Sequence, residues 1–330
     1  MLSLIHTGAA GVVLACASAA FAQQAIFSNA SADPAVPALN AVPNSTSGVP
    51  APVGGMWSEL TATSVTDANA LAGMACNTDT SGGVRLADNF IVPEGQAWNL
   101  SEVWLYVYQT GWATTTSPVA GATLRIWYGQ PGTPFAAVVW GDTVTNRYAS
   151  AQATNAYRIF TTEAGPPFAT VDSSRRVFRV ALSIDATLTP GEYWLDWQLT
   201  PTSPGATLFA AAATIPDFRT EHTWNAQQYA DGLWTSVIDP GKPAPATDLP
   251  LDAAFILTGT VGTACDSIDF NGDTLLPDVQ DITDFLIVFA GGACPTGTCG
   301  DIDFNNDGLL PDVLDIEALL SVFAGGPCLV

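Results

Sequence analysis

The sequence predicts a mainly β protein, an antiparallel, jelly-roll-like β-sandwich followed by a small α-helical domain. Between residues 57 and 262, short apolar and aromatic runs alternate with Gly, Pro, Asn and Asp, and no long helical pattern interrupts them. Many short strands with regular turn signals are typical of sandwiches and jelly rolls. Every Trp, Lys and Arg lies before residue 263, and this change of composition marks a separate domain from 263 to 330.

The N-terminus carries the pattern of an export signal. An apolar run extends from Leu2 to Ala20, and Ala20-Phe21-Ala22 forms a small-residue cleavage site, so residues 1–22 are interpreted as a signal peptide. A competing interpretation makes Cys16 the acylated cysteine of a lipoprotein. Both place the protein outside the cytoplasm, secreted, extracellular or at the cell surface. Residues 23–56 are rich in Ala, Pro, Ser, Asn and Gly and are expected to be a flexible lead-in, with room for one strand near its end.

Ten segments of the body are predicted strands: 84–92, 98–108, 122–128, 136–140, 156–161, 177–184, 192–199, 207–212, 223–229 and 253–261. Two of them alternate cleanly, which predicts one face in the core and one outside. The side chains predicted to share a face are Phe178, Val180, Leu182 and Ile184 on one strand, and Tyr193, Leu195, Trp197 and Leu199 on the other.

Charge limits the classes of partner. The chain has 31 acidic and nine basic residues, a net charge of −22. Binding to nucleic acid needs clustered Lys and Arg, so this class is excluded, and anionic membrane surfaces are disfavoured for the same reason. The balance favours cations.

The tail is an internal duplication. Residues 265–294 and 299–328 align with an offset of 34 and share 20 of 30 positions. Each unit opens with D-x-N-x-D, whose alternate side chains can converge on one ion, and a later carboxylate can close the coordination shell. The tail has no His, which disfavours zinc, and calcium suits oxygen ligands. The predicted ligands are Asp269, Asn271, Asp273 and Asp281, then Asp303, Asn305, Asp307 and Asp315, with Asp278 and Asp312 as intermediate ligands, direct or through water.

A helix is predicted after each loop. Pro277 and Pro311 suit a first helical turn, and the pairs 291–292 and 325–326 of Gly end the helices. Gly308 suits the turn after the third ligand, whereas Thr274 replaces it in the first unit, so we expect more strain there. The apolar stripes predicted to face each other are Val279, Ile282, Phe285, Leu286 and Phe289, and Val313, Ile316, Leu319, Leu320 and Phe323.

Cysteines agree with export. Four of the five that follow the signal bracket the two repeats, and we expect them to form disulfides. The pattern favours Cys265–Cys294 with Cys299–Cys328, although Cys265–Cys328 with Cys294–Cys299 also respects the symmetry. Cys76 is expected to be a buried, small apolar residue.

The tail resembles the dockerin family, specifically the Gly-Cys-ended dockerin-like tails of bacterial secreted proteins. The resemblance covers residues 265–328 and implies two bound calcium ions, held by the two sets of D-x-N-x-D residues with Asp281 and Asp315, and docking onto a protein partner or cell-envelope receptor. The closing Asp stands at position 13 of each loop, whereas ordinary dockerins place it at 12. The body loosely resembles the jelly-roll modules of bacterial surface-anchored proteins, through segments 87–93, 141–143 and 191–197.

The body offers weak signals for catalysis. Beyond the signal, His222 is the one histidine, and no G-x-S-x-G or Gly-rich phosphate loop is present. Glu192 and Asp196 share a strand face but lie about 13 Å apart, too far for a glycosidase pair. We therefore expect a non-catalytic protein. The alternatives are a carbohydrate-binding module, which predicts Trp194 or Trp104 exposed beside polar groups such as Asp196, and a polysaccharide-degrading enzyme in an extracellular assembly.

Overall fold

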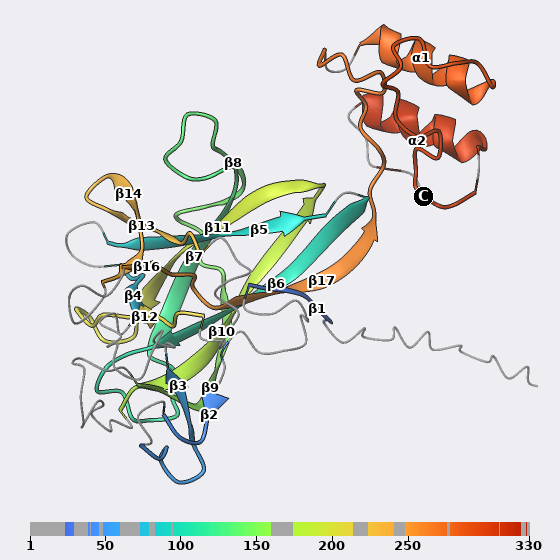
Figure 1. Ribbon diagram of the computed structural model, residues 1–330. Coiled ribbons are helices and arrows are strands. Elements are labelled where there is room, and N and C mark those ends of the chain that lie inside the picture. Colours follow the sequence, from blue (N-terminus) through green and yellow to red (C-terminus); the bar gives the residue numbers. More distant parts are fainter. Residues whose placement is uncertain are drawn as a thin grey trace, which may run out of the picture.

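The computed structural model describes residues 24–29, 39, 41–45, 49–59, 73–78, 83–93, 95–159, 174–213, 224–240, 248–275, 278–309, 311–324 and 328. These form β-sheets packed as the layers of a sandwich, followed by two α-helices (Figure 1). The prediction of a mainly β sandwich is confirmed. The signal peptide, Cys16, Pro277, His222 and the Gly pair at 325–326 lie outside the described residues. Neither helix is long and apolar enough to cross a membrane.

The larger sheet has nine strands in the order β1-β17-β6-β10-β9-β3-β2, with β12 paired to β6 and β4 paired to β12. Its strands are β1 (Gln24–Ser28), β2 (Ala41–Val42), β3 (Met56–Glu59), β4 (Met74–Ala75), β6 (Gln96–Tyr108), β9 (Tyr148–Ile159), β10 (Arg176–Leu188), β12 (Phe209–Ala210) and β17 (Phe255–Thr263). The pairs are antiparallel except β3 with β9, which is parallel.

The smaller sheet has six strands in the order β14-β13-β5-β11-β7-β8, all antiparallel. Its strands are β5 (Arg85–Val92), β7 (Val119–Tyr128), β8 (Ala137–Asp142), β11 (Gly191–Pro201), β13 (Gln227–Ala230) and β14 (Leu233–Ser236). A two-stranded ladder joins β15 (Ile238–Asp239) to β16 (Leu249–Pro250).

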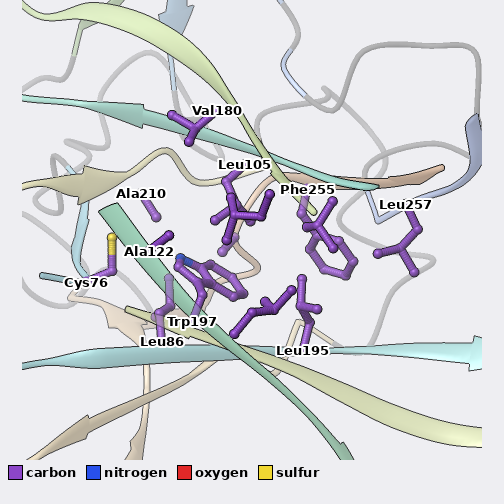
Figure 2. Packing of buried hydrophobic residues seen from close by; sticks show 14 of the residues in the cluster. Cys76, Leu86, Leu105, Ala122, Val180, Leu195, Trp197, Ala210, Phe255 and Leu257 are labelled. Atoms are coloured by element: carbon purple, nitrogen blue, oxygen red, sulfur yellow. The ribbon is translucent and has the colours of Figure 1, made fainter. Parts of the chain in front are cut away.

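The main core lies between the two sheets. The two predicted alternating faces, one on β10 and one on β11, both enter it. Figure 2 shows Trp197 near the middle of this core, with Phe255 of the opposite sheet on one side and Cys76 on the other. Cys76 is buried as predicted, and burial raises the pKa of its thiol to about 12.

The lead-in predicted over residues 23–56 contains two strands, β1 and β2, that were not predicted from the sequence, and β3 begins at Met56, where the prediction left room for one strand. β1 pairs antiparallel with β17 and thereby forms an edge of the nine-stranded sheet. Ile26 and Phe27 pack against the core, and the Asn29 side chain accepts the backbone N–H of Phe255 at 3.0 Å. Because the segment is polar and rich in Pro, its few apolar residues did not form a recognisable strand pattern. β9 also begins at Tyr148, earlier than predicted, because its first half is exposed and lacks an apolar pattern.

The tail folds around a small core of its own. Its helices are α1 (Val279–Phe289) and α2 (Val313–Phe323). The buried apolar residues of this core are Phe270, Phe285, Phe304, Ala318 and Leu319. The two predicted stripes are only partly right, because Val279 is 73% exposed and Val313, Leu286 and Leu320 are also exposed.

Candidate functional site

The two D-x-N-x-D segments fold into loops in which the same backbone N–H groups donate to the same side chains. In the first, Asp269 accepts the backbone N–H groups of Asp273 and Thr274, both at 3.0 Å, and Asn271 Oδ1 also accepts that of Asp273. In the second, Asp303 accepts those of Asp307 and Gly308 at 3.1 and 3.0 Å, and Asn305 Oδ1 accepts that of Asp307. Asp273 and Asp307 likewise accept the N–H groups of Leu275 and Leu309. The loops are thus equivalent in conformation.

A carboxylate from each helix reaches back to its loop. Asp281 Oδ1 lies 3.4 Å from the backbone nitrogen of Asn271, and Asp315 Oδ1 lies 3.4 Å from that of Asn305. Both carboxylates are fully buried. Each helix therefore starts with its predicted closing carboxylate held against the predicted loop.

Asp278 and Asp312, predicted as intermediate ligands, are the N-cap residues of the helices. Asp278 Oδ1 accepts the backbone N–H of Gln280 at 2.7 Å, and the Asp281 side chain in turn accepts the N–H of Asp278 at 3.0 Å. The second repeat forms the same capping box with Asp312 and Asp315. Capping satisfies backbone donors at the start of a helix, so these two residues have a structural role without any ion.

The charge of the repeats is uncompensated. From Cys265 to Val330 the sequence has 12 acidic residues and no Lys, Arg or His. Asp281, Asp284 and Asp315 are nevertheless buried. Burying a carboxylate without a positive partner is costly, so the arrangement is suited to a cation.

Among the described residues, no three His, Cys, Asp or Glu side chains converge as a metal centre. Each predicted ligand set combines carboxylates with the amide oxygen of one Asn. The loop carboxylates are turned to their own backbone N–H groups. An ion would have to draw them together.

Asp284 contacts the first loop, and it was not singled out from the sequence. Its carboxylate accepts the Asn271 amide at 3.1 Å and the Gln280 amide at 2.7 Å. The equivalent position in the second repeat is Ala318, so this carboxylate has no counterpart there. Comparing the repeats position by position would have shown an acidic residue at a buried helical position.

The disulfides are Cys265–Cys328 and Cys294–Cys299. The favoured alternative, one bond within each repeat, is therefore wrong, and the second symmetric alternative is correct. The first bond joins the two ends of the tail, and the second closes the short connection between repeats. The side chains of Thr296 and Thr298, within that connection, donate to the backbone carbonyl of Asn271 at 3.0 and 2.6 Å.

The candidate glycan contacts of the body are poorly placed for a ligand. Trp194 and Asp196 are 1% and 0% exposed, so neither is available to a glycan from solution. Trp104 is partly exposed, but the Arg179 guanidinium lies 4.4 Å from the centre of its ring and occupies that face. The expectation that Trp194 and Asp196 contact glycan is corrected, because they pack within the outer face of the smaller sheet.

Asp196 is instead the centre of a buried ion cluster. It accepts Arg85 Nε at 2.7 Å, Arg125 Nη2 at 2.6 Å and Trp127 Nε1 at 3.0 Å. Two arginines therefore neutralise a carboxylate that joins three neighbouring strands, β5, β11 and β7. This is a structural arrangement, and it leaves Asp196 committed to protein partners.

Neither a protein-family model, nor a curated protein, nor a solved structure matches the chain.

Proposed function

We propose that the tail is a dockerin-like module that binds two calcium ions and anchors the exported, jelly-roll-like sandwich to a protein partner or cell-envelope receptor. One observation carries the proposal. Two loops of matching sequence adopt the same hydrogen-bonded conformation, each facing a buried helical carboxylate, in a module without any positive side chain. Hard oxygen donors in this number and charge suit calcium better than other common metals.

Docking is supported by a repeated apolar surface. Leu275, Val279 and Leu286 are exposed in the first repeat, and their counterparts Leu309, Val313 and Leu320 are exposed in the second. Exposed apolar side chains that gather into one patch are typical of protein interaction sites. The duplicated exposure therefore favours a protein as the docking partner.

An extracellular location fits the two disulfides, which persist in oxidising compartments. The chain is proposed to act without catalysis. A carbohydrate-binding or polysaccharide-degrading role for the body gains no specific support, since Trp194 and Asp196 are buried.

The test is a calcium titration of the full exported chain with its disulfides intact, after removal of bound metal with a chelator. We expect calorimetry to give two ions bound per chain and far-ultraviolet circular dichroism to show a gain of helix, because binding free energy adds to folding free energy. No binding at millimolar calcium would reject the proposal. Retention on the exporting cells should then depend on calcium and fall when both Val279 and Val313 are replaced by Asp.

A further inference from the structure

The two repeats differ in how the Asn side chain of each loop is held. In the second repeat, Asn305 Nδ2 donates to Asp307 Oδ2 at 3.2 Å, and Asp307 is itself a predicted ligand. In the first repeat, Asn271 Nδ2 donates to Asp284 Oδ2 at 3.1 Å instead. Among the described residues, no side chain donates to the corresponding Oδ2 of Asp273. The first loop therefore keeps one more ligand oxygen available for an ion.

Asp284 is fixed and buried. It lies on α1 one turn after Asp281, and Gln280 of the same helix donates to its second oxygen at 2.7 Å. Its side chain is almost fully removed from water, at 1% exposure, and no positive residue exists in the tail. A buried carboxylate without a positive partner is an observation that points to a cation, independently of the loop conformation.

We propose that Asp284 is a positioning residue of the first calcium site, which orients Asn271 and supplies a buried negative charge that the second site lacks. The inference rests on the calcium binding proposed above. Asp284 does not need to touch the ion. It fixes the Asn271 amide so that Oδ1 faces the loop, and it relieves Asp273 of the hydrogen bond that Asp307 carries in the second repeat. Partners of metal ligands commonly act in this way.

Backbone strain at Thr274 opposes the contribution of Asp284 to the first site. Thr274 has φ of 67°, where Gly308 of the second loop has 77°, and a β-branched residue is disfavoured in that region. The first site thus combines a strained turn with a better-positioned Asn. Without Asp284, the strained turn should lower the calcium affinity of this site.

The test isolates each site in the full exported chain and measures binding of calcium alone by calorimetry. Asp315→Asn leaves the first site, and Asp281→Asn leaves the second. Adding Asp284→Ala to each background completes the comparison. We expect the affinity of the first site to fall about tenfold or more, while that of the second changes by less than about twofold. A general loss of folding would weaken both sites alike, so equal losses, or no loss at the first site, would overturn the inference.

Asp284→Asn separates position from charge, because an Asn can still accept from Asn271. We expect the calcium affinity of the first site in Asp284→Asn to lie between that of the unsubstituted residue and that of Asp284→Ala. An affinity as low as that of Asp284→Ala would show that Asp284 supplies charge without positioning, and it would also overturn the inference. Helical content at saturating calcium confirms that each variant is folded. If the unsubstituted chain binds no calcium, the proposed function itself fails. If it binds two ions and Asp284→Ala changes neither, only the present inference fails.

Discussion

Asp281 Oδ1 accepts the backbone N–H of Asn271 at 3.4 Å, and so ties the first turn of α1 to the loop that precedes it. The same carboxylate accepts the N–H of Asp278 through its other oxygen. This double connection fixes the rotation of α1 about its axis, with Asp281, Phe285 and Val288 turned inwards. The rotation explains why Val279 is left exposed.

Replacing the closing carboxylates should remove one calcium ion each. We expect Asp281→Asn and Asp315→Asn to reduce the calorimetric stoichiometry from two ions to one, because an amide of the same size lacks the charge and has one acceptor oxygen where the carboxylate uses two. Glu317→Gln is the matched control, since it removes the same charge from an exposed position of α2. Unchanged stoichiometry in both Asp variants would show that these carboxylates are not ligands.

The body was predictable wherever one strand face is buried. Leu195 and Trp197 alternate with polar or outward residues, and this period of two fixed both the strand and its inner face. β1 could not be predicted in the same way, since its order depends on pairing with β17, more than 200 residues away in the sequence. Long-range pairing of this kind leaves no local pattern.

The tail illustrates the limit of periodicity for small domains. Repetition alone predicted the loops and helices, but the stripe assumed that each helix buries all its apolar residues. Val279 and Val313 remain outside because a module of two short helices has too little core to cover both faces. The disulfide pairing and the contacts of Asp284 depend on how the helices pack against the loops, and this packing cannot be predicted from the sequence pattern.

Thr274 should be a site of stabilisation. It has φ of 67°, a region costing a non-glycine residue about 1–2 kcal/mol, so we expect Thr274→Gly to stabilise the tail by about 1 kcal/mol after the entropic cost of Gly. Urea unfolding followed by helical circular dichroism, in chelator, measures this. Gly308→Thr is the reciprocal control and should destabilise the tail, since no atom lies within 4 Å of its added Cβ and only backbone strain changes. Equal stability of Thr274→Gly and the unsubstituted chain would exclude strain at this turn.

The two disulfides should differ in their contribution to stability. Cys265–Cys328 has a sequence separation of 63 and Cys294–Cys299 one of 5. Chain-entropy arguments then give losses of about 4 and about 2 kcal/mol when each pair is replaced by Ala. Urea unfolding of the two double variants in chelator compares them directly. A larger loss for the short loop would mean that its contacts with Asn271, through Thr296 and Thr298, outweigh chain entropy.

Asp196 should be essential for stability of the sandwich. Asp196→Asn leaves two buried or half-buried arginines, Arg85 and Arg125, without their charge partner. Breaking a buried ion pair in this way costs about 3–5 kcal/mol, and chemical unfolding followed by Trp fluorescence measures it. Arg147→Ala is the control, because it breaks the longer and more exposed contact with Asp142, and it should cost much less. If both variants lose equally little, the cluster does not hold the three strands together.

Cys76 should make the folded body lose stability in alkali. Burial raises the pKa of its thiol to about 12, whereas an unfolded Cys ionises near pH 8.5. Above that pH the unfolded chain releases a proton that the folded chain retains, so the unfolded state is favoured by about 1.4 kcal/mol per pH unit until the folded thiol ionises near pH 12. Below pH 8.5 this contribution is constant.

The measurement for Cys76 is the urea midpoint of the body between about pH 8 and 10, compared with that of Cys76→Ala. The variant lacks the thiol, so its midpoint should fall less steeply with pH, even if its stability at neutral pH is lower because a small cavity replaces sulfur. Tyr108, whose pKa burial also raises to about 12, is present in both chains, and Cys76 is the smallest of the causes of its shift. Parallel pH curves for the two chains would mean that Cys76 ionises equally in both states, which contradicts its full burial in the core (Figure 2).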